Sequence, residues 1–180
     1  MGRTGKTQIV RCGGWGIELD DEGSGAWIGR EGLTAVVRAL DGRGQSTKLT
    51  SVFDEIYPST DINEPRTIVK AYSERSFEYH MLTPMVMNCA AEGDEVCHKI
   101  ISRAARHLME LPLTLLKEFK PGISIPVCLM GGIIDAKTIL AKMIEDEINA
   151  HEYLKLTKPK GTALDGAITL GYKMIEEFDE

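Results

Sequence analysis

Apolar positions follow two different periods along the chain, and these periods divide it into three stretches. Residues 7–12 are rich in β-forming side chains and end at two glycines, which predicts a short strand. Residues 125–130 form an apolar run that predicts a buried strand, and residues 153–156 predict a weaker one. Strands are therefore expected near both ends of the chain.

Between about residues 46 and 120 almost no apolar position alternates with a period of two. Apolar side chains recur every three or four positions instead, which is the spacing of one helix face. We expect the helix that contains Pro112 to kink or break there, because proline lacks a backbone donor. The helices predicted in this block cover residues 49–56, 65–72, 77–91 and 94–119.

The same helical spacing recurs on both sides of this block. It predicts a helix of about fifteen residues ending near Leu40, a second over residues 134–149 and a third over residues 161–178. Strands alternating with helices at the end of the chain imply a parallel pair covered by helices. The expected fold class is therefore α/β, with a mixed sheet and a helical insertion. Three strands are few for one sheet, which suggests further strands upstream of Met1.

Composition limits the classes of function. With 43% hydrophobic and 27% charged residues, the 180-residue chain resembles an ordinary soluble globular protein. No apolar run approaches the roughly 18–20 residues that cross a bilayer, and the first residues lack the apolar centre of a signal peptide. We therefore expect a cytoplasmic protein without a membrane partner. The net charge of −6 argues against nucleic acid, because neutralising phosphates requires clustered lysine and arginine.

Cysteine and histidine spacing gives no metal-binding pattern. The four cysteines contain no C-x-x-C pair, which favours reduced and mostly buried side chains. The four histidines have no spacing typical of a metal or catalytic set. We therefore expect no metal site. The cysteines are Cys12, Cys89, Cys97 and Cys128.

A glycine-rich, acidic loop at residues 13–25 is the first segment with candidate binding chemistry. Its glycines let the backbone approach a ligand closely, and Trp15 offers a flat apolar face to a sugar ring. Asp21 can accept hydrogen bonds from hydroxyls, and Ser24 with the Gly25 amide begins a helix that favours an anion or a hydroxyl. The alternative is a loop in which Ser24 is only an N-cap and Trp15 fills the core.

A glycine pair, Gly131 and Gly132, directly follows the strand predicted at 125–130. Ligands of open α/β sheets bind in the crevice beyond the carboxyl ends of the strands. A glycine pair at that position permits close packing of an adenosine. The alternative is a turn that needs only conformational freedom.

Together these motifs resemble the N-acetylglucosamine and glucosamine kinases of the BadF/BadG/BcrA/BcrD ATPase family, within the superfold of sugar kinases, Hsp70 and actin. The run from Gly13-Gly14-Trp15-Gly16 to Asp21-Glu22-Gly23-Ser24-Gly25 is similar to their signature loop. Met130-Gly131-Gly132 resembles the adenosine motif, and residues 161–167 resemble the closing helix. The family usually has glycine where this chain has Asp20, which adds charge and bulk beside the sugar site.

The resemblance implies the C-terminal lobe of an actin-like ATPase (ribonuclease H-like) fold over residues 1–180, with the helical insertion at about 46–120. It implies phosphorylation of an amino sugar, N-acetylglucosamine or glucosamine, by ATP with Mg²⁺. The implied substrate-binding residues are Gly14, Trp15, Gly16, Asp21 and Gly25. The implied nucleotide-binding residues are Gly131, Gly132, Cys89 and Ala91.

The resemblance also implies that the general base and the phosphate loops belong to an N-terminal lobe, which this sequence lacks. No catalytic residue is therefore assigned, and we expect the chain alone to be inactive and to pair with that lobe or to form a homo-oligomer. Two alternatives remain open. One is a non-catalytic module that binds a sugar or nucleotide. The other is an activator ATPase of the same superfold, which the scattered cysteines disfavour.

Overall fold

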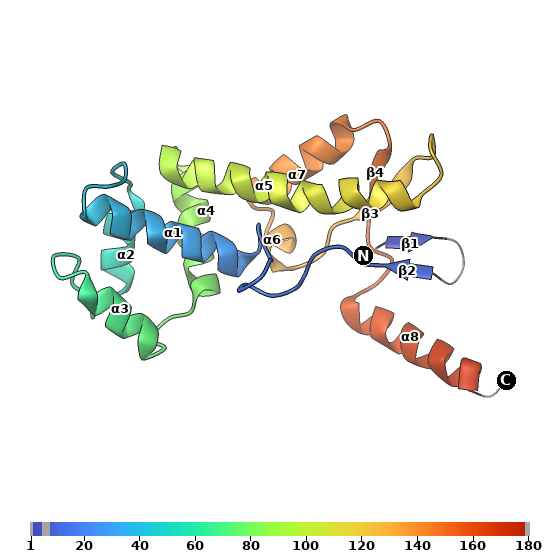
Figure 1. Ribbon diagram of the computed structural model, residues 1–180, viewed down its shortest axis with the longest axis horizontal. Coiled ribbons are helices and arrows are strands. Elements are labelled where there is room, and N and C mark those ends of the chain that lie inside the picture. Colours follow the sequence, from blue (N-terminus) through green and yellow to red (C-terminus); the bar gives the residue numbers. More distant parts are fainter. Residues whose placement is uncertain (1, 5–7, 179–180) are drawn as a thin grey trace.

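Helices make up most of the molecule, and strands occur only toward the two ends of the chain (Figure 1). The computed structural model describes residues 2–4 and 8–178. The elements are β1 (Gly2–Thr4), β2 (Gln8–Val10), α1 (Gly25–Leu40), α2 (Leu49–Ile56), α3 (Arg66–Ser73), α4 (Tyr79–Ala91), α5 (Glu95–Leu115), the 3-10 turn η1 (Leu116–Glu118), β3 (Ile125–Cys128), α6 (Gly132–Asp135), α7 (Ile139–Ala150), β4 (Leu154–Thr157) and α8 (Ala163–Phe178).

Helix α1 begins where the acidic loop ends. The Ser24 side chain accepts a hydrogen bond from the Trp27 amide at 3.1 Å, which satisfies one of the free donors of the first turn. The helix ends at Leu40, and Gly42 follows with φ of +77°, a conformation that glycine adopts without steric cost. The helix predicted here is confirmed.

Helices α1 and α4 approach each other through small residues. A Cβ atom on Gly29 would lie 1.7 Å from the Tyr79 carbonyl oxygen, and one on Gly32 would lie 2.5 Å from the Val86 side chain. Around this crossing the core is apolar and tightly buried, and it extends to α2, α5 and α7. Its largest fully buried side chains include Phe53, Phe77, Ile28, Ile68, Ile101, Leu140 and Ile148.

Asp94 ties the start of α5 to the loop before α2. Its carboxylate accepts hydrogen bonds from the amides of Cys97 at 2.8 Å and Lys48 at 2.7 Å, and from the Thr47 hydroxyl at 3.0 Å. Burial alone would raise the pKa of Asp94, but these hydrogen bonds together hold it below its usual value. The carboxylate is thus both an N-cap and a cross-link between segments far apart in sequence.

The strands form two separate pairs. Strand β1 runs antiparallel to β2, with Gly2 opposite Val10, whereas β3 runs parallel to β4, with Ile125 opposite Leu154. The predicted parallel pair is confirmed. Among the residues that the structure describes, no hydrogen-bonded ladder joins the two pairs, so the expected mixed sheet is present as two pieces.

Three details differ from the sequence-based expectations. Strand β3 alternates between half-buried and exposed residues and is not fully buried. Helix α5 continues through Pro112 to Leu115 instead of breaking there. The helix expected over 134–149 is two helices, because Lys137 has φ of +50° and the Thr138 side chain caps α7.

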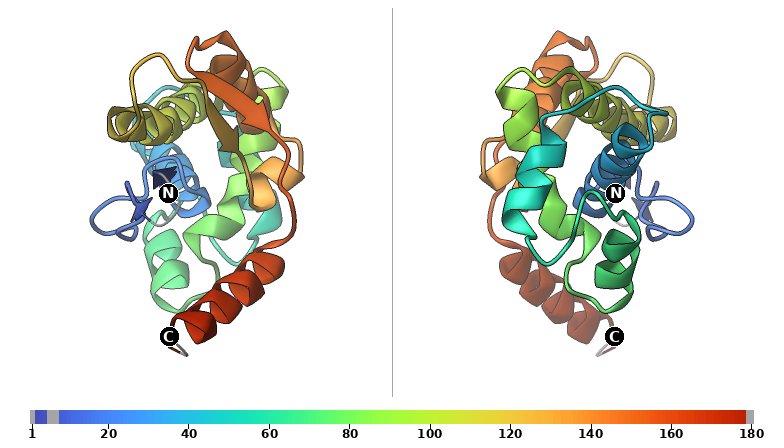
Figure 2. Two further views of the ribbon diagram at one scale, coloured as in Figure 1. Left: turned by 90° about the vertical axis from the view of Figure 1, so that its right-hand side faces the viewer. Right: turned by 90° about the vertical axis from the view of Figure 1, so that its left-hand side faces the viewer.

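Helix α8 is present as predicted, and Figure 1 shows it apart from the other helices, below the strands; Figure 2 shows it in views along the long axis of the molecule. Its apolar side chains are largely exposed, including Leu164 at 68% and Ile175 at 59%. Across the described residues, no helix has both the length and the apolar character needed to cross a membrane.

Candidate functional site

The acidic loop is shaped by residues in the left-handed region and by its own carboxylates. Gly14 and Gly16 have φ of +82° and +94°, and Asp21 has φ of +64°. The Asp20 carboxylate accepts a hydrogen bond from the Trp15 amide at 3.3 Å, and the Asp21 carboxylate accepts one from the Gly16 amide at 3.2 Å. Both acids therefore hold the tryptophan-bearing turn in place.

The loop rests on helix α5 through two of its glycines. A Cβ atom on Gly13 would lie 2.7 Å from the Leu111 side chain, and one on Gly23 would lie 2.7 Å from the Ala104 carbonyl and the Leu108 side chain. A side chain at Gly23 would push the loop away from the backbone of α5. The glycines thus have a packing role as well as a conformational one.

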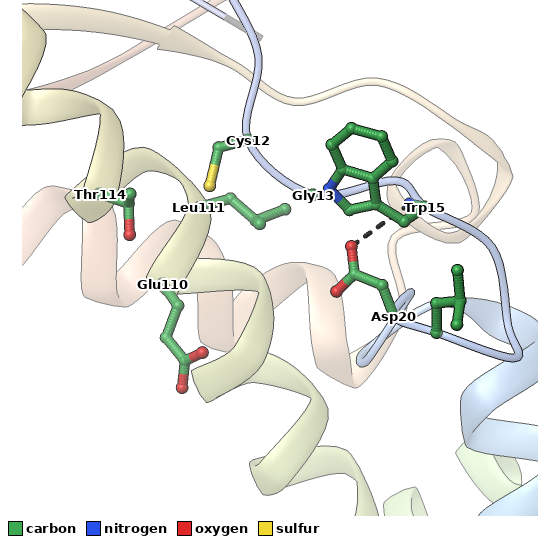
Figure 3. A pocket seen from close by; sticks show the side chains of 8 residues that line it. Cys12, Gly13, Trp15, Asp20, Glu110, Leu111 and Thr114 are labelled. Atoms are coloured by element: carbon green, nitrogen blue, oxygen red, sulfur yellow. Dashed lines mark hydrogen bonds between the residues drawn. The ribbon is translucent and has the colours of Figure 1, made fainter.

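A hollow of about 400 Å³ lies between the loop and α5, in the size range of small-molecule sites (Figure 3). Trp15 stands at its rim with 76% of its surface exposed, so the alternative in which this residue fills the core is wrong. The loop and the residue before it contribute Cys12, Gly13, Trp15, Leu19 and Asp20 to the lining, and α5 contributes Glu110, Leu111 and Thr114.

The hollow combines an apolar surface with carboxylates. The Trp15 ring and the Leu111 side chain supply apolar area, and Asp20 and Glu110 supply acceptor oxygens. Glu110 lies 3.6 Å from the His107 ring nitrogen, on the next turn of the same helix. An aromatic face beside carboxylates suits a polyhydroxylated ring, which presents both C–H faces and hydroxyl donors.

The start of α1 lies beside the glycine-pair turn. The Gly25 carbonyl accepts a hydrogen bond from the buried Thr83 hydroxyl at 2.5 Å. A Cβ atom on Gly25 would lie 3.8 Å from the Ile133 side chain, which directly follows the pair. Gly131 has φ of +118°, which disfavours any side chain there, and a Cβ atom on Gly132 would meet nothing within 4 Å. The fold therefore brings the last residue of the acidic loop close to Ile133, the residue after the glycine pair.

Two of the nucleotide-binding residues expected from the sequence lie farther along α4. Cys89 is six residues beyond Thr83, about 9 Å along the helix at 1.5 Å per residue, and Ala91 ends the helix. Cys89 is 2% exposed, and burial raises the pKa of its thiol. Ala91 is exposed. The structure does not place either residue beside Gly25, and their role in nucleotide binding stays a prediction.

Sequence reasoning missed the residues that α4 and α5 add to the site. Thr83, Glu110 and Thr114 lie on helices of the expected insertion, in which the sequence pointed only to Cys89 and Ala91. A signal was present in the helical spacing of Leu108, Leu111 and Leu115, which gives α5 a face to pack against another segment. Nothing in the spacing identified the acidic loop as that segment.

Comparisons with known proteins show which sequences this chain is similar to. The family model described as the BadF/BadG/BcrA/BcrD ATPase family matches residues 3–171. The chain is 34% identical over 145 residues to an N-acetyl-D-glucosamine kinase of Dictyostelium discoideum, covering 77% of this chain and 44% of that one. It is 25% identical over 171 residues to the glucosamine kinase GspK of Vibrio cholerae, covering 94% and 52%.

A solved structure extends the likeness to the fold. The crystal structure of a Chromobacterium violaceum protein, provisionally assigned as an N-acetylglucosamine kinase, aligns with a TM-score of 0.62 and 26% identity, over 88% of this chain and 50% of that one. The actin-like ATPase fold class expected from the sequence is thereby confirmed. The chain spans about half the length of these relatives. From the match over residues 3–171, the chain belongs to the BadF/BadG/BcrA/BcrD ATPase family.

Proposed function

We propose that this chain is the C-terminal lobe of an amino-sugar kinase, which transfers a phosphoryl group from ATP to a hydroxyl of N-acetylglucosamine or glucosamine. The observation that carries the proposal is the proximity of the two motifs, because a Cβ position on Gly25, at the end of the acidic loop, lies 3.8 Å from the Ile133 side chain beside the glycine pair. A kinase must hold the sugar and the nucleotide next to each other, because positioning supplies much of the rate of phosphoryl transfer.

The acidic loop is the sugar-binding part of the proposed site. Trp15 would stack on the sugar ring or its N-acyl group, and the Asp21 oxygen that does not receive the Gly16 amide would accept a hydroxyl. Gly14 and Gly16 keep the turn open, and Gly25 begins the helix beside it. Asp20 adds a carboxylate to the hollow, which favours a substrate with a free ammonium group.

The glycine pair is the nucleotide-binding part of the proposed site. The space around Gly132 is free of protein atoms within 4 Å of a Cβ position, so an adenosine can approach the backbone there. Cys89 and Ala91 would contribute from the far end of α4. Mg²⁺ would arrive bound to the phosphates of ATP, where it neutralises the charge that develops during transfer.

Catalysis by this chain would need a second lobe. In the lobe that this chain forms, residues 46–120 would be a helical insertion. The relatives are about twice as long as the chain, and a positioned general base alone contributes about 10²–10⁴ in rate. We propose that the second lobe pairs with this chain in the cytoplasm, with no nucleic acid or membrane partner. The exposed apolar side chains of α8 would favour self-association when that lobe is not present.

Titration of the purified chain tests sugar binding and nucleotide binding separately. Calorimetry with N-acetylglucosamine, glucosamine and ATP should detect binding of a sugar and of the nucleotide, without sugar-dependent ATP turnover. Trp15→Ala should weaken sugar binding at least tenfold and leave ATP binding unchanged. Gly132→Val should weaken ATP binding and leave sugar binding unchanged, because the added side chain occupies only open space.

Tyr172→Ala is the matched control for Trp15→Ala, because this aromatic residue on α8 is also exposed, at 66%. It should leave both affinities unchanged. Binding of neither ligand, or equal losses in Trp15→Ala and Tyr172→Ala, would refute the proposed site. ATP turnover by the chain alone would refute its assignment as a single lobe.

A further inference from the structure

A second hollow of about 400 Å³ lies between helices α1 and α5, on a part of the molecule that the acidic loop does not reach. Thr34, at its centre on α1, is nine residues from Gly25, or about 13 Å along the helix. The lining consists of Glu31, Thr34, Ala35, Arg38, Gly44, Gln45, Val96, Lys99, Ile100 and Arg103. None of these residues belongs to the site described above.

The second hollow is cationic in an acidic protein. Three cationic side chains, Arg38, Lys99 and Arg103, line it against one carboxylate, Glu31, whereas the chain as a whole has a net charge of −6. Glu95 lies 3.9 Å from Lys99 but is not part of the lining. Arg103 and Lys99 each have a carboxylate partner, Glu31 and Glu95, so Arg38 is the lining cation whose charge most favours an anionic ligand.

The cations are held in different ways. Arg103 is fixed by an ion pair with Glu31 at 2.8 Å and lies over the Trp27 ring at 5.0 Å. Lys99 donates to the Gln45 side chain at 3.2 Å. Arg38 donates only a long hydrogen bond, 3.5 Å, to the Arg43 carbonyl, and no carboxylate of the described residues lies within 4.0 Å of its guanidinium. Arg38 and Lys99 can therefore turn toward a ligand at little cost.

We propose that this hollow binds a phosphate monoester of a small polyhydroxylated molecule. Arginine pairs with phosphate through two parallel hydrogen bonds, and lysine adds a mobile point charge. The hollow has a volume of about 400 Å³, whereas one water molecule occupies about 30 Å³ in the liquid. A phosphate group would therefore fill only part of the hollow. Thr34 and Gln45 can hydrogen-bond hydroxyls in the remaining space, over an apolar floor that includes Ile100.

A ligand bound in the second hollow would affect the acidic loop through Arg103. The guanidinium contacts the ring of Trp27, which is 3% exposed and donates its amide to the Ser24 cap. A phosphate that draws Arg103 away from Glu31 therefore changes a contact directly behind the start of α1. The binding proposal itself does not depend on the proposed kinase function, because the two sites share no lining residue.

NMR titration of the ¹⁵N-labelled chain tests the proposal, with glucosamine 6-phosphate as the probe. Saturable shifts are expected at the amides of Gln45, Val96 and Arg103. Unphosphorylated glucosamine should leave these amides unchanged, and inorganic phosphate should bind them at least threefold more weakly. Shifts confined to residues 13–25, or inorganic phosphate binding as tightly as the ester, would overturn the proposal.

Two variants with intact packing separate this site from general charge effects. Arg38→Gln and Lys99→Gln each remove one cation from the lining without touching the core, and each should weaken binding of the ester at least fivefold. Arg106→Gln removes an exposed arginine of α5 outside the lining and should leave the affinity unchanged. Equal affinities in all three variants would show that the ester does not bind in this hollow.

Discussion

The two tryptophans of the chain lie in two regions that differ in how far they bury large apolar side chains. Trp27 is 3% exposed within the helical block of α1, α4 and α5, where its ring contacts Arg103 and His107. Trp15 is 76% exposed on the acidic loop, twelve residues earlier. The block holds itself together by packing, whereas the loop presents a large apolar side chain that the described contacts do not bury. Because the exposed Trp15 ring adds little to the free energy of folding, its presence points to a role in binding.

The same contrast separates the block from the periphery. The core that this block shares with α2 buries aromatic pairs such as Phe53 with Phe77, at 5.7 Å between ring centroids. Helix α8 leaves Leu164, Ile168 and Tyr172 at least half exposed, and the strand pairs have open edges. The block is a complete hydrophobic core, and the periphery carries surfaces that remain available for partners.

Exchanging each tryptophan for alanine should give the largest difference between the two regions. Trp27→Ala removes a buried ring and should lower the free energy of unfolding by about 3–5 kcal/mol. Trp15→Ala should change it by less than about 0.5 kcal/mol, because its ring is exposed. Urea unfolding followed by circular dichroism measures both. A comparable loss in the two variants would show that the loop is part of the core.

A glycine exchange makes the same comparison for the backbone. Gly29→Ala would place a methyl group 1.7 Å from the Tyr79 carbonyl oxygen, so α1 and α4 must separate, at a cost of about 1–3 kcal/mol. Gly166→Ala on α8 meets no atom within 4 Å and should raise helix stability slightly, by up to about 1 kcal/mol of intrinsic propensity. Thermal unfolding distinguishes them, and a neutral Gly29→Ala would contradict the close crossing.

Sequence reasoning succeeded where local periodicity decides the structure. The helices ending at Leu40 and Ile56 and the parallel pair of β3 with β4 follow from apolar spacing and glycine or proline stops. The Ser24 cap follows from residue type alone. These features depend on residues a few positions apart, so the chain reveals them directly.

It failed at features that apolar periodicity does not encode. Pro112 does not break α5, which continues for one further turn to Leu115. The single helix expected over 134–149 is divided by the Thr138 cap, a local signal that apolar periodicity concealed. Glu110 and Thr114 join the hollow only because Gly13 allows the loop to rest on α5.

The smallest expected effect concerns two aspartates that cap helices in the two regions. Asp94 binds the amides of Cys97 and Lys48, whereas Asp165 accepts hydrogen bonds from Thr162 on the exposed side of α8. Burial opposes ionisation of Asp94, but its hydrogen bonds prevail and lower its pKa, while the hydrogen bonds from the Thr162 amide and hydroxyl lower the pKa of Asp165. Only the first joins segments of the folded core.

Asp94→Ala should therefore lower the free energy of unfolding by about 1–2 kcal/mol at neutral pH. A depressed pKa stabilises the fold above the unfolded value of about 4, and this stabilisation is lost as the pH falls through the lower folded pKa. The loss caused by Asp94→Ala should thus shrink in urea titrations between about pH 5 and pH 2. Asp165→Ala should leave the unfolding midpoint unchanged at each pH, since α8 lies apart from the block. If Asp165→Ala matched Asp94→Ala, α8 would have to unfold cooperatively with the helical block, and the division between the two regions would fail.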